Sequence, residues 1–203
     1  MFKGSIVALI TPFKNNVMDE DKYVSLIHHH IANGTKGVVP AGTTGESPTL
    51  SNDEHKRVIE IAVKECKGKI PVIAGTGSNS TDEAVNLSRY AEKAGADAIL
   101  VVTPYYNKPT QEGLYQHYKL INDNVGIPII IYNIPPRSVI DMSVDTMARL
   151  FELKNIVGVK DATADLDRVN KQMKKMGPEF IQLSGEDATA LDFNMRGGTR
   201  CIS

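Results

Sequence analysis

The sequence predicts one α/β domain, a (β/α)8 TIM barrel that spans residues 1–203 and ends in its eighth strand. Short runs rich in β-branched residues alternate along the chain with longer amphipathic segments. The runs recur at intervals of roughly 25–30 residues, and polar residues with reactive side chains follow several of them. Near-continuous apolar strands separated by helices indicate a parallel sheet that is buried on both faces.

The individual elements follow from local signals. Cap residues followed by acids mark several helix starts, as at Ser51, Thr81 and Ser143. Glycines follow helix ends, where a left-handed residue is favoured, at positions 34, 68, 95 and 177. The strands are expected at 5–10, 37–40, 70–74, 96–102, 128–132, 156–160, 180–183 and 200–203. The helices are expected at 20–33, 52–67, 81–94, 110–124, 143–152, 166–176 and 187–195.

Eight strands favour a closed barrel over an open doubly wound sheet, which would need a phosphate-binding loop. Gly75 and Gly77 follow a predicted strand, but the third glycine and an acidic partner about 20 residues further on are missing. We interpret this segment as an ordinary loop between a strand and a helix. Because the chain stops inside the eighth strand, we expect the eighth helix to be absent and one edge of the barrel to be bare.

Composition excludes several classes of function. With 23 Lys and Arg against 24 Asp and Glu, the net charge is -1, which offers no basic field for nucleic acid or a membrane surface. Cys66 and Cys201 lack metal-ligand spacing and fit a reducing cytoplasm. The consecutive residues His28, His29 and His30 cannot converge on one metal ion, because neighbours on a helix point about 100° apart. We expect a soluble, cytoplasmic protein without a membrane span or a metal.

Lys160 is the strongest candidate for a catalytic residue. It closes the apolar run Asn155-Ile-Val-Gly-Val-Lys160, and burying an unpaired ammonium there costs several kcal/mol. A desolvated lysine loses its proton more readily and attacks a carbonyl to form a Schiff base. Lowering its pKa by about 3 units costs about 4 kcal/mol of charged-state stability. The alternative is a lysine whose amine snorkels out of the strand end.

Barrel enzymes build their sites at the carboxyl ends of the strands, and two loops there carry candidate binding groups. The second strand is followed by Gly42-Thr-Thr-Gly-Glu46, whose backbone amides and two hydroxyls suit an anion such as a carboxylate. The alternative is a turn that caps the next helix. The fourth strand is followed by Tyr105 and Tyr106, which either pack within the loop or supply a phenol that relays a proton.

Two further strand ends complete the candidate site. Tyr132 closes the fifth strand, and prolines stiffen the loop between it and Arg137. The phenol is suited to proton transfer beside a neutral amine. The Arg137 guanidinium is suited to bind a substrate carboxylate. Considered by itself, however, Arg137 would more readily pair with an acidic residue on the surface. After the seventh strand, Gly185 leaves room above the barrel mouth, while Glu186 and Asp187 are adequately explained as acids that start the next helix.

Together these motifs resemble those of the 4-hydroxy-tetrahydrodipicolinate synthases, formerly dihydrodipicolinate synthases, a family of pyruvate-dependent class I aldolases. The motifs are Gly42-Thr-Thr-Gly-Glu46, Thr103-Pro-Tyr-Tyr-Asn107, Tyr132-Asn-x-Pro-x-Arg137 and Gly158-Val-Lys160. The resemblance runs from the opening Phe2-x-Gly-Ser-Ile-Val-Ala8 to the closing Gly197-Gly198 and Ile202-Ser203. It implies a TIM barrel without metal or nucleotide, and condensation of pyruvate with L-aspartate 4-semialdehyde in diaminopimelate and lysine biosynthesis.

The resemblance also implies a role for each motif residue. Lys160 would form the Schiff base with pyruvate, and Thr43 and Thr44 would hold the pyruvate carboxylate. Thr44, Tyr132 and Tyr106 would form a proton relay, with Tyr106 reaching in from a neighbouring subunit of a homotetramer. The remaining substrate-binding residues would be Arg137, which binds the carboxylate of the semialdehyde, and Gly185 and the backbone of Ile202, which line the pocket.

N-acetylneuraminate lyase and the sugar-acid aldolases are the nearest alternatives, because they share the fold and the lysine. The lyase branch usually reads Gly-Ser-Thr-Gly-Glu where this chain has Thr43 and Thr44, and it lacks an arginine in the place of Arg137. Both features favour the synthase.

Some members of the family are inhibited by L-lysine at a site between subunits. The matching residues here would be Ser47, Pro48, His55, Asn79, Glu83 and Tyr105. His55 and Glu83 are retained as in the lysine-sensitive members, whereas Pro48 and Asn52 depart from the best-known pattern. We expect feedback inhibition by lysine.

The chain is shorter than its family. The resemblance implies a further helix and a C-terminal helical segment that are absent here. Exposing the outer apolar faces of strands one and eight would weaken the fold at about 25 cal/mol per Å², so folding is expected to depend on oligomer contacts. A non-catalytic remnant that acts only as a binding or subunit partner is the alternative to an active enzyme.

Overall fold

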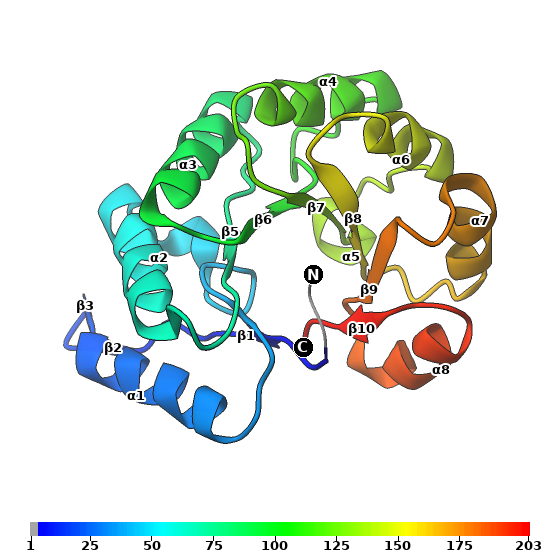
Figure 1. Ribbon diagram of the computed structural model, residues 1–203. Coiled ribbons are helices and arrows are strands. Elements are labelled where there is room, and N and C mark those ends of the chain that lie inside the picture. The colour runs from blue at the N-terminus through cyan, green and yellow to red at the C-terminus, as the bar shows by residue number, and fades with distance from the viewer. Residues whose placement is uncertain (1–3) are drawn as a thin grey trace.

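The computed structural model describes residues 4–203, so Phe2 of the predicted opening motif lies outside the described residues. The chain forms an α/β fold around a curled parallel sheet in the order β10-β9-β8-β7-β6-β5. A second parallel pair, β1 with β4, is joined to the two edges of this sheet by the bridges Ile6↔Ile202 and Val38↔Val72. The arrangement is TIM-barrel-like (Figure 1). The strands are β1 (Val7–Ala8), β4 (Val38–Val39), β5 (Ile73–Gly75), β6 (Ala98–Val102), β7 (Ile129–Asn133), β8 (Ile156–Asp161), β9 (Ile181–Ser184) and β10 (Arg200–Cys201).

An outer helix lies between each of these strands and the next, and these helices surround the ring of strands (Figure 1). Polar caps set several starts: Ser51 and Glu54 form a reciprocal capping box, and Ser143 accepts from the Thr146 N–H. The predicted helices are present as α1 (Glu20–Ala32), α2 (Asn52–Cys66), α3 (Thr81–Ala94), α4 (Gln111–Asn122), α6 (Val144–Phe151), α7 (Asp167–Met176) and α8 (Ala190–Met195). Of the helices in residues 4–203, none is long and apolar enough to cross a membrane.

The structure adds short elements that the sequence analysis missed. A hairpin of β2 (Phe13–Lys14) and β3 (Val17–Met18) turns through Asn15 and Asn16, both at positive φ, a conformation that asparagine tolerates. A strand of two residues is too short to show an alternation of apolar and polar residues in the sequence. The other additions are single turns: α5 (Pro135–Ser138) and the 3-10 turns η1 (Ser47–Thr49) and η2 (Asp187–Thr189).

Side chains of the strands alternate between two apolar layers. On β6, Ala98 and Leu100 pack inside the ring, whereas Ile99 and Val101 pack outward against the helices. Ile130 and Tyr132 of β7 lie in the inner layer. Each large apolar side chain that is fully buried contributes roughly 1.5–3 kcal/mol.

Cover on the outer face is weakest where β1 meets β10. Val7 and Cys201 are only partly buried there, whereas the outward-facing Ile99 is fully buried under the helices. On the neighbouring α8, Leu191 and Met195 are 73% and 78% exposed.

A register shift in β8 decides which way its side chains point. Ile129 pairs with Ile156, but the next residue, Ile130, pairs with Gly158. Ile156 packs in the outer layer, and regular alternation would turn Lys160 outward as well. The one-residue bulge reverses the alternation and aligns Lys160 with Tyr132, which faces inward.

Replacing Gly158 by alanine should destabilise the protein. An added Cβ would lie 2.1 Å from the Ile181 carbonyl oxygen and 2.6 Å from Ile181 Cβ, so β9 would have to move. We expect the free energy of unfolding to fall by at least about 2 kcal/mol, measured by urea denaturation. Gly126→Ala is the control, because there the nearest atom is the flexible end of the Glu92 side chain. Equal denaturation midpoints for the two variants would contradict the role of Gly158.

Candidate active site

Lys160 lies in the inner layer of the ring. Its register partners are Tyr132 on β7 and Leu183 on β9, which both belong to the inner apolar cluster. Lys160 is 7% exposed, and its Nζ lies 4.4 Å from the centroid of the Tyr132 ring. The prediction of a buried lysine near a strand end is confirmed, although β8 continues for one residue beyond it.

Burial lowers the pKa of Lys160 to about 8, and the Asp187 carboxylate, together with the Cys201 thiol when that is ionised, acts in the opposite direction. Desolvation dominates because water can no longer solvate the ammonium. An amine with a pKa near 8 is neutral in roughly a tenth of the molecules at pH 7. Lys160 can therefore act as a nucleophile at neutral pH.

Gly185 supplies the space that the Lys160 side chain occupies. It directly follows β9, and a Cβ added to it would lie 2.8 Å from Lys160 Cε and 3.1 Å from Ala162 Cβ. A side chain at this position would displace the amine. The predicted role of this glycine in leaving room at the mouth agrees with this geometry.

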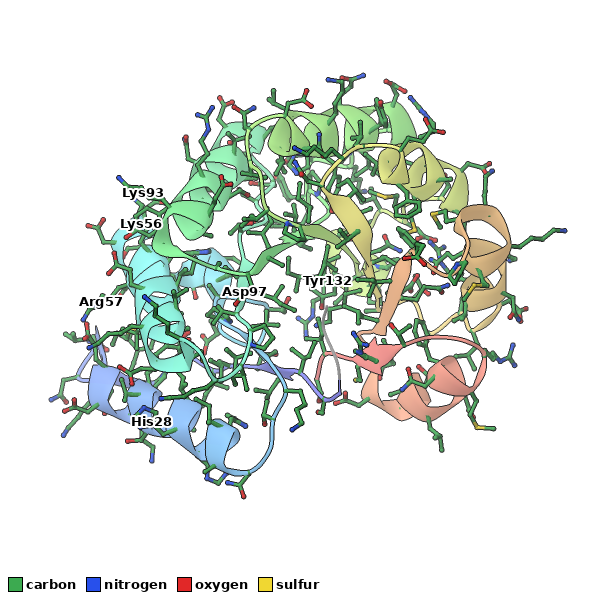
Figure 2. The ribbon with its side chains drawn as sticks, in the orientation of Figure 1. His28, Lys56, Arg57, Lys93, Asp97 and Tyr132 are labelled. Carbon is green, nitrogen blue, oxygen red and sulfur yellow. The ribbon has the colours of Figure 1, made fainter. Side chains whose placement is uncertain are left out.

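Tyr132 is the second buried polar group inside the ring, and Figure 2 shows it near the centre of the strands. It is 5% exposed. Burial raises the pKa of its phenol, while the Thr43 side chain and the Arg137 charge lower it and Glu186 raises it further. Desolvation is thus the main influence on this hydroxyl.

The loop after β4 leaves two backbone amides free. The N–H groups of Gly45 and Glu46 donate to Gly42 and Thr43 carbonyls, whereas within residues 4–203 no bond is donated by the N–H groups of Thr43 and Thr44. Both threonines are exposed at the mouth of the ring. Ser51, outside this loop, caps α2, while Glu46 precedes the 3-10 turn η1 without a side-chain capping bond.

Two predicted site residues lie apart from the buried pair. Tyr106 is 86% exposed with φ 68°. Arg137 is exposed in the turn α5. Ile202, by contrast, is 1% exposed, and its N–H donates to the Ser184 carbonyl at 2.9 Å.

Asp187 is a charged group that influences Lys160 and that the sequence did not indicate. Asp187 accepts from Ser203 Oγ at 3.0 Å and lies 3.8 Å from Cys201 Sγ. We interpreted Asp187 only as a helix start, which describes its place at η2 but not its effect on Lys160. Because Asp187 and Cys201 lie near the ends of predicted strands, the strand-end rule applied to them as well.

A separate cavity of about 210 Å³ contains most of the residues predicted to bind lysine. Ser47, Pro48, His55, Glu83 and Tyr105 line it together with Asn52. His55 is 5% exposed and lies 2.8 Å from the Gly75 carbonyl oxygen, and Glu83 accepts a hydrogen bond from Ser78. Asn79 is not among its lining residues, and its carbonyl oxygen instead accepts from Asn107 Nδ2 at 2.8 Å.

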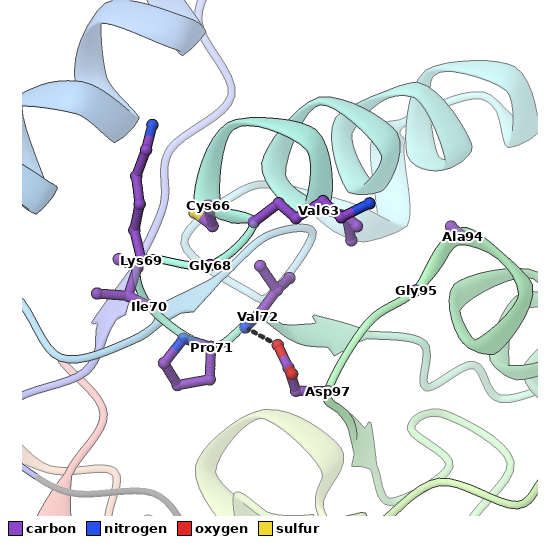
Figure 3. A pocket seen from close by; sticks show the side chains of 11 residues that line it. Val63, Cys66, Gly68, Lys69, Ile70, Pro71, Val72, Ala94, Gly95 and Asp97 are labelled. Carbon is purple, nitrogen blue, oxygen red and sulfur yellow. Dashed lines mark hydrogen bonds between the residues drawn. The ribbon is translucent and has the colours of Figure 1, made fainter.

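The cavity in Figure 3, about 510 Å³ in volume, lies at the opposite end of the strands. It is bounded by the last residues of α2 and α3, Cys66 and Ala94, and by Val72 and Asp97, which precede β5 and β6. Asp97 Oδ2 accepts from the Val72 N–H at 2.8 Å. In barrel folds this face serves stability, so we do not assign the cavity to the site.

Among residues 4–203, no group of three or more His, Cys, Asp and Glu side chains is arranged to hold a metal ion. His28 of the histidine run pairs instead with Glu65 at 2.8 Å. Both cysteines are free thiols.

These features define a class: a TIM-barrel-like α/β protein with a desolvated lysine at the carboxyl ends of its strands. Comparison with known proteins specifies the family. The model of the dihydrodipicolinate synthetase family matches residues 1–203. The chain belongs to this family.

Relatives and solved structures agree with the family. The chain is 75% identical to the 4-hydroxy-tetrahydrodipicolinate synthase of Pelagibacter ubique (strain HTCC1062), over 100% of this chain and 69% of that protein. It is 69% identical to the same enzyme of Rhodopseudomonas palustris (strain BisA53), over 100% of this chain and 68% of that protein. The crystal structure of dihydrodipicolinate synthase from Aquifex aeolicus matches with a TM-score of 0.98 and 52% identity, over 100% of this chain and 69% of that one.

Two further structures were solved with small molecules. The chloride-inhibited dihydrodipicolinate synthase of Acinetobacter baumannii, complexed with pyruvate, matches with a TM-score of 0.97 and 48% identity. The enzyme of Cyanidioschyzon merolae with lysine bound matches with a TM-score of 0.96 and 39% identity. Each match covers 100% of this chain and 70% of the other.

Replacing Asp187 by asparagine should lower the pKa of Lys160 below about 8. The carboxylate favours the ammonium and raises this pKa, so its removal shifts the titration of Lys160 to lower pH. Competitive acetylation of lysines as a function of pH, read by peptide mass spectrometry, measures the shift. Asp192→Asn, on the exposed side of α8, is the control and should leave the titration unchanged. A Lys160 pKa that rises or stays constant in D187N would contradict the influence of the Asp187 charge.

Proposed function

We propose that this chain catalyses the condensation of pyruvate with L-aspartate 4-semialdehyde through a Schiff base on Lys160. The observation that carries the proposal is the buried Lys160 amine with a pKa of about 8. The names of relatives 75% and 69% identical over the whole chain support the same reaction. In this reading the protein is a lyase of lysine and diaminopimelate biosynthesis.

In the first step, the neutral Lys160 amine attacks the carbonyl carbon of pyruvate. A carbinolamine forms, its hydroxyl leaves as water after protonation, and the imine remains. The free N–H groups and hydroxyls of Thr43 and Thr44 are suited to hold the pyruvate carboxylate. Their exposure at the mouth leaves them open to a substrate.

Proton transfer is assigned to a relay of Thr44, Tyr132 and Tyr106. The Tyr132 ring lies beside the Lys160 amine, so its hydroxyl is suited to move a proton to the leaving water. Thr43 is the threonine that affects the Tyr132 pKa, and Thr44 lies next to it in the same loop. Tyr106, exposed on this chain, is proposed to enter the relay of a neighbouring subunit.

Carbon–carbon bond formation follows. Loss of a methyl proton converts the imine to an enamine, whose terminal carbon attacks the aldehyde of the semialdehyde. Arg137, exposed at the mouth, is suited to bind the carboxylate of this second substrate. Gly185 and the backbone of Ile202 are proposed to line the pocket.

The assembly is also a proposal. We infer that residues 1–203 act as one (β/α)8 catalytic domain. A homotetramer, built as a dimer of dimers, would bring Tyr106 to its site. A cytoplasmic location is the prediction of the composition. The reaction as written needs no cofactor.

Incubation with pyruvate and borohydride should leave a reduced adduct on Lys160. Borohydride traps the imine, and intact-mass measurement with peptide mapping places the added mass. Lys160→Met should abolish the adduct, because no other lysine among residues 4–203 is buried. Lys154→Met, at an exposed lysine shortly before β8, is the matched control and should retain it.

Each of three outcomes of this experiment is decisive. An adduct, followed by turnover when L-aspartate 4-semialdehyde is added, supports the synthase. An adduct that turns over only sugar-acid or N-acetylneuraminate substrates would favour the related aldolases. A folded sample that gives no adduct would contradict the enzyme and favour a non-catalytic remnant.

L-Lysine is proposed as an inhibitor that binds in the 210 Å³ cavity. Glu83 offers a carboxylate for an ammonium group, and His55 and Tyr105 offer polar side chains in the same wall. The related enzyme solved with lysine bound supports this assignment.

Lysine at millimolar concentration should reduce activity, and Glu83→Gln should weaken the inhibition by about tenfold or more, since one charged hydrogen bond is lost. Initial rates against lysine concentration measure both. Glu60→Gln, on the outer surface of α2, serves as the control. The site assignment fails if E83Q and the unchanged protein are inhibited equally.

A further inference from the structure

A buried ion network lies directly behind the two site residues of β7 and β8. Asn133 follows Tyr132, Asp161 follows Lys160, and Asn133 and Asp161 are register partners. Because side chains alternate along a strand, Asn133 and Asp161 face the helices, whereas Tyr132 and Lys160 face the interior. The network therefore holds the strand ends from the opposite side of the sheet.

Asp161 is the centre of the network. Its side chain is 3% exposed, and its Oδ2 accepts from Arg168 Nε at 3.1 Å and Gln172 Nε2 at 3.3 Å, both on α7. Its Oδ1 accepts from the N–H and the Oγ1 of Thr163, at 2.9 Å and 2.6 Å. The residue after Lys160 is thus fixed to both α7 and the following loop.

Arg168 connects Asp161 to the loop that follows β7. Its Nη1 donates to Asp141 Oδ2 at 2.8 Å, and its Nη2 donates to the Met142 carbonyl at 2.6 Å. The guanidinium is 9% exposed, so water competes little for these bonds. The planar guanidinium of Arg168 donates to three acceptors on two segments, and a lysine ammonium cannot reproduce this geometry.

Asn133 completes the network through two further hydrogen bonds. Its Nδ2 donates to Asp141 Oδ1 at 2.7 Å, and its Oδ1 accepts from the Met142 N–H at 3.0 Å. The segment that carries Arg137 is thereby fixed to the end of β7 at one side and, through Arg168, to the end of β8 at the other.

We propose that Arg168 is a positioning residue that fixes Lys160 and the Arg137 loop in one geometry by joining Asp161 to Asp141. This inference rests on the proposed function. Neither Arg168 nor its carboxylates face the interior, so they act through the strand ends and not on substrate. A buried ion pair contributes little net stability compared with apolar residues of similar size, and a displacement of about 1 Å at a reacting amine can cost up to 100-fold in rate.

Arg168→Lys should slow trapping of the pyruvate imine on Lys160 by about 10- to 100-fold at saturating pyruvate. It should also raise the KM for the semialdehyde, since the Arg137 loop loses an anchor. The control is Arg149→Lys, because Arg149 also joins two helices, donating to Glu112 at 2.9 Å, but has no link to a strand end. R149K should retain the trapping rate and both KM values.

Asp141→Asn tests the link to the Arg137 loop separately from the link to Lys160. An amide has one acceptor oxygen where the carboxylate serves both Asn133 and Arg168, so one of these bonds is lost. Asp141 is half exposed, and the variant is expected to fold. D141N should raise the KM for the semialdehyde at least tenfold while changing the rate of imine trapping less than threefold, a split that general loosening would not produce.

The outcomes distinguish this inference from the proposed function. Absence of an adduct on the unchanged protein overturns the proposed function and this inference with it. An adduct that forms as fast on R168K as on the unchanged protein overturns the inference alone. If R168K does not fold, D141N decides: an unchanged KM for the semialdehyde overturns the inference, and the predicted split supports it.

Discussion

Desolvation of the Lys160 amine is the constraint around which the rest of the site is arranged. The ring of apolar strands lowers the pKa of Lys160 to about 8, and it can do so only while the side chain faces inward. Gly185 leaves the volume that the side chain needs, and the Tyr132 ring lies 4.4 Å from the amine. Asp187 and Cys201 oppose the shift. The pKa therefore reflects a balance between apolar walls and a few charges at the rim.

The inward direction of Lys160 depends on one irregularity in the backbone. In a regular strand, Ile156 and Lys160 would share a face, and Ile156 packs outward. The bulge between Ile156 and Gly158 reverses the alternation, and the absence of a side chain at Gly158 allows the Ile181 carbonyl to lie against the bulge. The Asp161–Arg168 pair then fixes the strand from its outer face. The position of the Lys160 amine thus depends on three features: the apolar packing inside the ring, the bulge in β8, and the ion network on the outer face of the sheet.

Much of the site was predictable because chemistry in a parallel barrel collects at strand ends. Lys160, Tyr132 and the Thr43–Thr44 pair were identified from that rule and the types of residue involved. Asp187 was missed because an acid at a helix start already had a sufficient explanation, and Arg168 because its partners lie 7 and 27 residues away along the chain. The hairpin of β2 and β3 and the turn α5 were missed because so few residues carry no periodic signal.

The sequence by itself determined the order of strands and helices, the parallel sheet and the identity of the reactive groups, since these depend on local periodicity, caps and residue chemistry. Only the tertiary structure decided which side of the sheet Lys160 faces and that one guanidinium connects the end of β8 to the segment after β7. Each of these depends on contacts between segments distant in the chain. Register, desolvation and buried ion pairing exist only once those segments pack together.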